Sequence, residues 1–232
     1  MKETKKIRVK VKKRKLKIKN MLILLMLVIL ICNTIYLVLH IRIKNIYILN
    51  NKIVSDKEII NESYLDNYPY YFLTFKSKIK SNLLKNNNYI KDVKVTKKNF
   101  KVYLDINEYK MLAIYNNKII LENKNMVDNN YKINNLPIIT NDISSVYDDF
   151  VYYFTKIDDN ILLKISQIEY TPNEVDKSRF LLYMNDGNSV YVTLTRIEKL
   201  NRYSSIVSQM DGKLGIIYLD SGDYIELKDW GV

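Results

Sequence analysis

The sequence predicts an α+β protein with an N-terminal transmembrane helix, a β-α-α-β-β module, and a second strand-rich domain whose sheet is antiparallel or mixed and accompanied by a few helices. An uncharged apolar stretch occupies residues 21–41. The segments after it change from alternating to helical spacing and back, and short alternating strands dominate from residue 110 onward. The expected divisions are therefore a basic tail at 1–20, the helix at 21–41, the first module at 42–109 and the second domain at 110–232.

The apolar stretch has the length of a membrane-crossing helix. Its 21 residues, from Met21 to Ile41, contain no Asp, Glu, Lys or Arg. As a helix they would span ~31 Å, against a hydrocarbon core of ~30 Å. A cleaved signal peptide is the alternative, but its apolar region would be ~7–15 residues long and would end at small residues. This stretch is longer and ends in LVLHIRIK, so we expect an uncleaved anchor.

The net charge of +12 comes from the N-terminal tail. Residues 1–20 contain 11 basic side chains and one acidic side chain, whereas the rest of the chain has a net charge of only +2. A nucleic-acid partner is therefore not expected. By the positive-inside rule the tail stays in the cytoplasm, next to the anionic lipids of the inner leaflet, and residues 42–232 lie outside the plasma membrane.

In the first module, the pattern predicts a strand, two helices and a hairpin. Ser55 and Glu58 form a capping box for the short first helix, and Pro69 interrupts the chain after it. Phe75, Ile79 and Leu83 then have helical spacing. The expected elements are a strand over 41–51, a helix from 55, a helix over 74–88 and a hairpin over 89–108.

In the second domain, strands are expected over 111–117, 118–125, 136–140 and 164–172, a hairpin over 179–194 and a final hairpin over 215–227. Asp186-Gly187 is a strong turn signal for the first hairpin. A helix over 143–154 can be capped by Asn141 or Asp142. A second capping box, Thr195 with Glu198, predicts a helix over 195–210.

Residues suited to catalysis are scarce. The only Cys and the only His, Cys32 and His40, lie in or at the end of the apolar stretch, which excludes Cys–His nucleophiles, His proton relays and the usual zinc sites from a folded domain. No metal or cofactor is expected. Ser77 to Lys80 match the S-x-x-K pattern of serine acyl-enzymes, so a membrane-anchored extracytoplasmic cell-wall enzyme is an alternative. The companion patterns S-D-N and K-T-G are absent, which favours a binding protein.

The order of elements resembles the bacterial cell-division family FtsQ, called DivIB in Gram-positive bacteria, and the β-α-α-β-β module is similar to a POTRA domain. In the first module the likeness lies in IKNIYIL, SDKEI and NYIKDVKVTKKNFKVYLDINEYKMLAI, where Glu108 falls at the place of a family glutamate. In the second domain it lies in ISQIEYTP, FLLYMNDGNSVYV, KLNRYSSIVSQM and GIIYLDSGDYIEL. A secretion factor with POTRA domains is a third possibility, which would need a downstream membrane barrel.

The resemblance implies a non-enzymatic divisome scaffold at the division septum. Such a protein docks the FtsB (DivIC)–FtsL pair, which governs septal peptidoglycan synthesis. In the family, the partner adds a strand at the C-terminal edge of the second domain, so that backbone hydrogen bonds provide the affinity.

Carried over to this sequence, the resemblance places the partner contact on the last hairpin. The implied residues are Tyr218, Asp220, Gly222, Asp223, Tyr224, Ile225, Glu226, Leu227 and Trp230. Alternation along a strand offers another reading, in which Ile225 and Leu227 fill the core, and we expect this for one of the two faces. Trp230 is either a partner anchor or a cover for the end of the domain.

Overall fold

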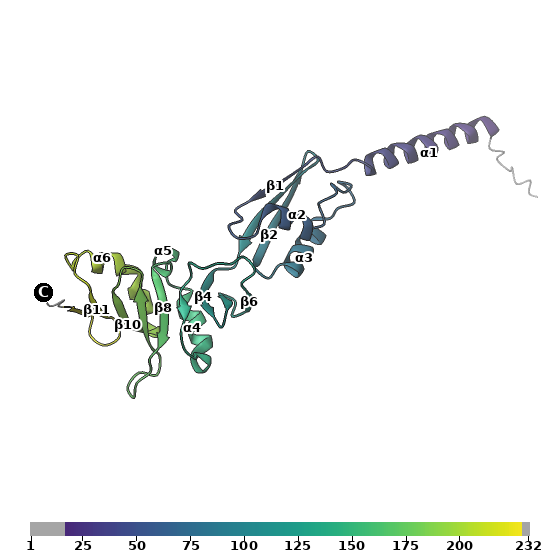
Figure 1. Ribbon diagram of the computed structural model, residues 1–232. Helices are drawn as coiled ribbons and strands as arrows, with labels where there is room; N and C mark the ends of the chain where they lie inside the picture. Colours follow the sequence, from purple (N-terminus) through teal and green to yellow (C-terminus); the bar gives the residue numbers. More distant parts are fainter. Residues whose placement is uncertain (1–16, 229–232) are drawn as a thin grey trace, which may run out of the picture.

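The computed structural model describes residues 17–228. It consists of a long N-terminal helix followed by two sheet-containing units (Figure 1). The helix, α1 (Ile18–Leu39), has no buried side chain and is long and apolar enough to cross a membrane. It starts three residues before the expected Met21 and ends two residues before Ile41. Its 22 residues span about 33 Å, which matches the hydrocarbon thickness.

The first unit has the expected β-α-α-β-β order. Its elements are β1 (Asn45–Leu49), α2 (Asp56–Glu62), α3 (Lys76–Asn86), β2 (Ile90–Lys98) and β3 (Lys101–Glu108). The three strands are ordered β1-β3-β2, with β1 parallel and β2 antiparallel to β3. The Ser55 cap is confirmed, since its Oγ accepts a hydrogen bond from the Glu58 N–H at 3.3 Å. Ile79 and Leu83 are buried as expected, but Phe75 precedes α3 and is 64% exposed.

The second unit is built on one mixed sheet of nine strands. The strands are β4 (Met111–Tyr115), β5 (Lys118–Leu121), β6 (Met126–Asp128), β7 (Ile138–Ile139), β8 (Ile165–Tyr170), β9 (Arg179–Met184), β10 (Ser189–Thr193), β11 (Gly215–Tyr218) and β12 (Tyr224–Leu227). Their order is β12-β11-β10-β9-β8-β7-β4-β5-β6. The β4–β7, β7–β8 and β10–β11 pairs are parallel, and the others are antiparallel.

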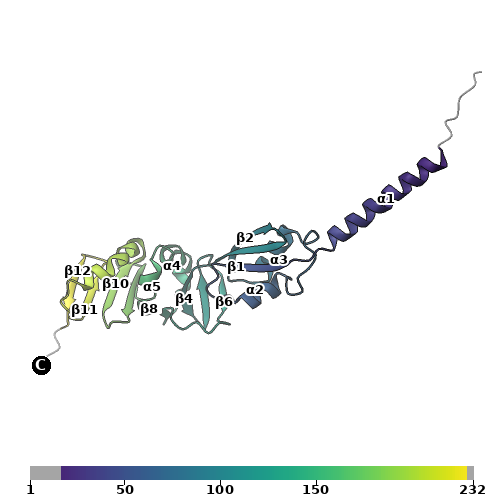
Figure 2. The same ribbon diagram turned by 90° about the horizontal axis from the view of Figure 1, so that it is seen from above.

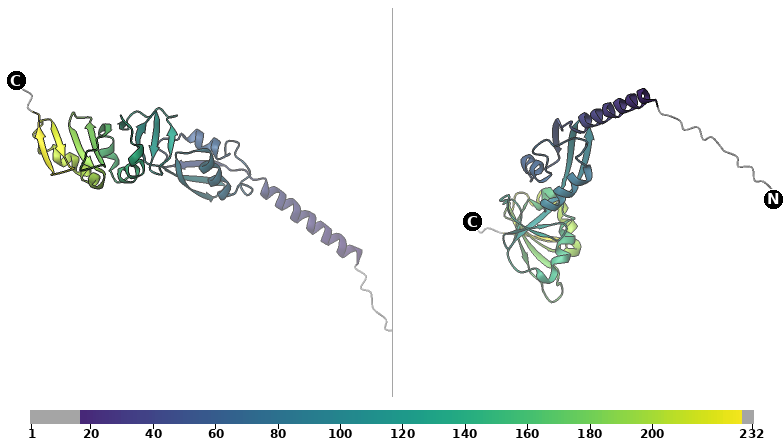
Figure 3. Two further views of the ribbon diagram at one scale, coloured as in Figure 1. Left: turned by 90° about the horizontal axis from the view of Figure 1, so that it is seen from below. Right: turned by 90° about the vertical axis from the view of Figure 1, so that its right-hand side faces the viewer.

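Helices lie on one face of this sheet (Figure 3). They are η1 (Ser144–Val146), α4 (Tyr147–Phe154), α5 (Asp159–Leu162), η2 (Leu194–Arg202) and α6 (Tyr203–Val207). Phe150 and Phe154 of α4 stack at 4.0 Å between ring centroids and pack with Phe180 of β9 in the main core. The helix-bearing face therefore holds the hydrophobic core of this domain.

The predicted helix over 195–210 has a different form. The segment begins with nine residues of 3-10 helix, and no side chain caps it, so the predicted Thr195 capping box is wrong. Its buried apolar residues recur at every third position: Leu194, Ile197, Leu200 and Tyr203. Because a 3-10 helix has three residues per turn, this spacing places all four on one face. The predicted cap by Asn141 or Asp142 is met by Asp142, whose Oδ1 accepts a hydrogen bond from the Ser144 N–H at 3.0 Å, but the segment opens as η1 and becomes α-helical only at α4.

The two units share part of their core. Ile119, Leu121 and Val127, from the β5–β6 end of the large sheet, are buried in one cluster with residues of the first unit. Two tyrosines add hydrogen bonds, from Tyr131 Oη to Glu58 Oε1 at 2.6 Å and from Tyr89 Oη to the Asp128 carbonyl at 2.7 Å. As a result α1, the first unit and the second unit follow one another in a row, with β12 at the end farthest from α1 (Figure 2).

Candidate partner-binding edge

Strand β12 forms one edge of the nine-stranded sheet. It pairs with β11 in antiparallel register, with Ile217 opposite Ile225 and Tyr218 opposite Tyr224. All four of its residues are exposed. The expectation that one face of β12 fills the core is wrong, because burial ends one strand earlier: Ile217 is 1% exposed and Ile225 36%.

The backbone of β12 presents a defined set of groups to solvent. The Lys228 N–H donates to the Leu214 carbonyl at 2.8 Å. In an antiparallel pair, hydrogen-bonded and non-hydrogen-bonded positions alternate. It follows that the peptide groups of Tyr224 and Glu226 face β11, whereas the N–H and C=O groups of Ile225 and Leu227 point away from the sheet. Within residues 17–228 no strand pairs with this side of β12.

A row of aromatic rings crosses the helix-free face and ends on β12. We call Tyr191, Tyr218 and Tyr224 the tyrosine row. Neighbouring rings stack at centroid distances of 5.3 and 4.4 Å. The Arg179 guanidinium covers the inner end, 3.8 Å from the Tyr191 centroid, and Tyr218 Oη donates to Glu226 Oε2 at 3.2 Å. Stacked cross-strand pairs of this kind stabilise a sheet, so the row holds the exposed Tyr224 ring in place.

The turn before β12 is held by basic side chains. Arg179 Nε lies 2.7 Å from Asp220 Oδ2, and Arg196 Nη1 donates to the Asp220 carbonyl at 2.8 Å. Asp223 pairs with Arg196 at 3.4 Å and with Lys199. Burial acts to raise the pKa of Asp220, but hydrogen bonds from Arg179 and Ser221 and the positive charge of Arg179 together hold that pKa below its usual value.

The structure thus places the expected contact residues in three different roles. Tyr224 to Leu227 form the exposed strand, whereas Gly222 and Asp223 lie in the turn, where Asp223 adopts a φ of +54°. The Asp220 carboxylate is 8% exposed and pairs with Arg179, so it holds the turn in place. Tyr218 supports Tyr224 from behind, and Trp230 lies outside the described residues.

The sequence pattern does not predict the basic residues that hold this turn. Arg179 is 41 positions from Asp220, and Arg196 and Lys199 are 27 and 24 positions from Asp223. No local motif connects such pairs. They meet because β10 pairs in parallel with β11, which brings the start of η2 next to the last turn.

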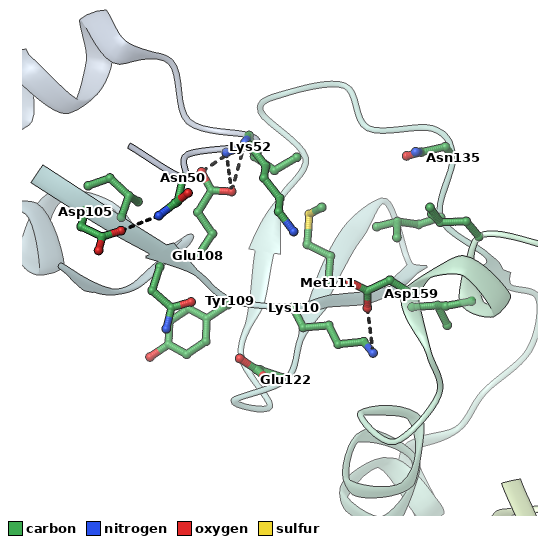
Figure 4. Close-up of a pocket in the computed structure, with 16 residues that line it drawn as sticks. Asn50, Lys52, Asp105, Glu108, Tyr109, Lys110, Met111, Glu122, Asn135 and Asp159 are labelled. Atoms are coloured by element: carbon green, nitrogen blue, oxygen red, sulfur yellow. Dashed lines mark hydrogen bonds and ion pairs between the residues drawn. The ribbon is translucent and has the colours of Figure 1, made fainter. Parts of the chain in front are cut away.

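A cleft of about 890 Å³ lies at the junction of the two units (Figure 4). Most of the charged groups that line it have partners in the structure. Glu108 accepts hydrogen bonds from the N–H groups of Lys52, Ile53 and Val54 at 2.9 to 3.2 Å. Lys110 Nζ pairs with Asp159 Oδ1 at 2.9 Å. These bonds link the start of α2, the end of β3 and α5, so the cleft is a structural joint.

Replacing Glu108 by Gln is expected to lower the free energy of unfolding by about 1–2 kcal/mol, because an amide has one acceptor oxygen, whereas both oxygens of the carboxylate accept hydrogen bonds from the backbone N–H groups of Lys52, Ile53 and Val54. Urea unfolding of the full chain in detergent measures the change. Asp105→Asn is the matched control: its carboxylate accepts an exposed bond from Asn50 and its loss should stay within about 0.5 kcal/mol. Equal losses for the two variants would contradict the structural role of Glu108.

Ser77 and Lys80, the residues of the enzyme alternative, both lie exposed on α3. Ser77 lies exposed in the first turn of α3, and Lys80 Nζ pairs with Asp92 Oδ1 at 2.5 Å. Between residues 17 and 228 no hydrogen bond joins the Ser77 hydroxyl to the Lys80 ammonium. The contact with Lys80 lowers the pKa of Asp92, which strengthens the reading of a surface ion pair.

Comparison with known proteins identifies two family models along the chain. Residues 41–109 match the POTRA domain of FtsQ type, and residues 111–227 match the C-terminal domain of the cell division protein FtsQ/DivIB. The cell division protein DivIB of Leuconostoc kimchii is 31% identical over 194 residues, covering 78% of this chain and 77% of that protein. DivIB of Bacillus subtilis is 28% identical, covering 80% and 74%.

A solved structure also aligns with the chain. It is the major extracytoplasmic domain of the trans isomer of DivIB from Geobacillus stearothermophilus, with 20% identity and a TM-score of 0.38, covering 45% of this chain and 96% of that one. The two family models together cover most of the chain, and the DivIB relatives match it across both folded units. The chain therefore belongs to the FtsQ/DivIB family of cell-division proteins.

Proposed function

We propose that this protein is a non-enzymatic divisome scaffold that docks the FtsB (DivIC)–FtsL pair by strand addition to β12 and so helps to control septal peptidoglycan synthesis. Membership of the cell-division family supports a divisome role. The observation that carries the finer proposal is the outward-facing peptide groups of Ile225 and Leu227, on a strand that is exposed on both faces. An added strand would take up these donors and acceptors and cover the apolar side chains beside them.

The proposal includes a topology. Residues 1–20 lie in the cytoplasm against anionic lipids, 21–41 cross the bilayer, and the domains at 42–109 and 110–232 lie outside, at the septum. It is supported by α1, by the basic charge that precedes it, and by the position of both folded units after it. With β12 at the far end of the row (Figure 2), the partner would be bound at a distance from the membrane surface.

Exchanging Ile225 for Pro tests the strand-addition mechanism at a single N–H group. Proline lacks the outward N–H and its ring occupies the approach of an added strand, but it leaves the bonds to β11 in place, since edge strands tolerate Pro where the N–H faces solvent. Affinity for the purified DivIC–FtsL pair should fall about tenfold or more, because one hydrogen bond and the contacts next to it are lost. Binding of the full chain in nanodiscs can be measured by biolayer interferometry.

Ile225→Ala is the matched control for this experiment. It removes a similar apolar side chain and keeps the N–H, so its effect should be clearly smaller than that of Ile225→Pro. Unfolding curves for both variants confirm that the domain is intact. If the Ile225→Pro and Ile225→Ala variants bound the DivIC–FtsL pair with equal affinity, the partner would be recognised through side chains alone and strand addition would be refuted.

A further inference from the structure

Three segments of the first unit meet where the chain leaves α1. The Ile43 N–H donates to the Pro69 carbonyl at 3.0 Å, and the Tyr71 N–H donates to the Ile41 carbonyl at 2.7 Å. The turn between β2 and β3 joins them, because the Lys44 N–H donates to the Phe100 carbonyl at 2.8 Å. Since α1 ends at Leu39, these backbone bonds hold the α2–α3 loop and the β2–β3 turn within a few residues of the membrane-crossing helix.

These segments carry a group of aromatic and apolar side chains that are exposed or only partly buried. We call it the juxtamembrane patch: Tyr68, Tyr70, Tyr71, Phe72, Leu73, Phe75 and Phe100. Its most exposed members are Tyr68, Phe72, Leu73 and Phe75. Phe100 contacts Tyr71 and Phe72 with centroid distances of 5.3 and 6.2 Å. A contiguous exposed apolar surface marks an interaction site more often than a chance arrangement.

The conformation of the β2–β3 turn also supports a surface role for the patch. Asn99 and Phe100 have φ angles of +50° and +61°. Two-residue hairpin turns with two positive φ angles favour Asn-Gly, and a bulky aromatic residue in this region is strained. Folding of the hairpin does not require Phe at this position. An aromatic side chain kept there at a cost in strain is consistent with a surface role.

The charge around the patch is strongly basic. The basic side chains are Arg42, Lys44, Lys76, Lys78, Lys97, Lys98 and Lys101, and the acidic residue among 64–78 and 97–101 is Asp66. Lys97 lies inward: its Nζ donates to the carbonyls of Tyr71 and Thr74. Arg42 lies over the Tyr70 ring and Lys44 over the Phe100 ring, 5.3 and 5.5 Å from the centroids. Basic side chains on aromatic rings suit the interface of a bilayer with anionic lipids, where rings sit at headgroup level and Lys and Arg pair with phosphates.

We propose that the juxtamembrane patch inserts into the headgroup region of the bilayer on the side of the folded units. The inference goes beyond partner capture at β12 and rests only on α1 crossing the membrane. The continuity of the patch with α1 and its basic surroundings favour lipid over a protein as the occupant. Inserted in this way, the patch would hold the POTRA domain on the membrane surface and fix the direction in which the second domain projects.

Depth-dependent fluorescence quenching tests the insertion in the full chain. In a Trp230→Phe background, a single Trp is introduced at Phe72 or Phe75 in the patch, at Leu30 in α1, or at Val175, a 96% exposed position of the second domain. The proteins are reconstituted into phosphatidylcholine–phosphatidylglycerol vesicles with brominated acyl chains. Leu30→Trp and both patch variants should be quenched, the latter by about twofold, and Val175→Trp should not be.

The variants test the insertion of the patch separately from the membrane anchor on which it depends. The insertion would be overturned if Trp at position 30 were quenched but Trp at positions 72 and 75 were quenched no more than Trp at position 175. The patch would then be a surface for a protein partner. Lack of quenching at position 30 would remove the membrane anchor and the insertion with it. Ile225→Pro should leave every quenching value unchanged, so failure of partner capture at β12 would be visible separately.

Discussion

Replacing Gly215 by Ala is expected to displace β12 and to lower the free energy of unfolding by about 3 kcal/mol, the upper end of the range for overpacking. A Cβ added at this buried position would lie 2.6 Å from the Glu226 carbonyl oxygen and 3.0 Å from the Met210 methyl carbon. The first contact is with backbone of the paired strand, which cannot be relieved by a rotamer change. The strain therefore falls on the β11–β12 ladder.

Hydrogen exchange and partner binding locate this effect. The amides of Tyr224 and Glu226, which face β11, should lose protection in Gly215→Ala, and capture of the DivIC–FtsL pair should weaken although no outward-facing group is altered. Gly222→Ala is the matched control: its added Cβ meets only side-chain atoms of Tyr224, the nearest at 3.1 Å, and no backbone of a paired strand. Unchanged protection and binding in Gly215→Ala would mean that the edge does not depend on close β11–β12 pairing.

Turns and helix starts that depend on a local residue pattern could be predicted from the sequence. The turn signal Asp186-Gly187 predicts the β9–β10 hairpin, and Gly187 has the positive φ of +92° that such turns need. The Ser55 capping box predicts the start of α2. In both cases the residues that determine the structure are within four positions of one another, so tertiary contacts had little to override.

Features that depend on strand order could not be obtained in this way. Alternation along residues 224–227 predicts one buried face, but burial depends on whether another layer covers the strand, and the helices that cover Ile217 leave Ile225 exposed. The parallel pairing of β10 with β11 likewise has no local signal. It is this pairing that aligns Tyr191 with Tyr218 and forms the tyrosine row.

Exchanging Arg179 for Ala is expected to lower the free energy of unfolding by about 3 kcal/mol near neutral pH. The change leaves the Asp220 carboxylate, only 8% exposed, without its charged partner, and breaking a largely buried pair from one side is strongly destabilising. The turn before β12 would also lose a contact that holds it, so partner binding should weaken. Urea unfolding of Arg179→Ala, Asp220→Asn and the double variant gives the coupling free energy between the two side chains.

The pH dependence distinguishes the ion pair from the packing of Arg179 on Tyr191. In the folded chain the pKa of Asp220 is lowered from its ordinary value of 3.8. A carboxyl whose pKa is lowered by folding stabilises the protein above the unfolded value, and that contribution is lost as the pH falls through the folded value. The stability difference between wild type and Arg179→Ala should therefore be complete at neutral pH and should shrink as the pH falls below about 3.8. Arg179 also lies 3.8 Å from the centroid of the Tyr191 ring, and this contact does not depend on pH because Arg179 stays charged at every pH used. A stability difference that stayed constant across this range would therefore assign the lost stability to the contact with Tyr191.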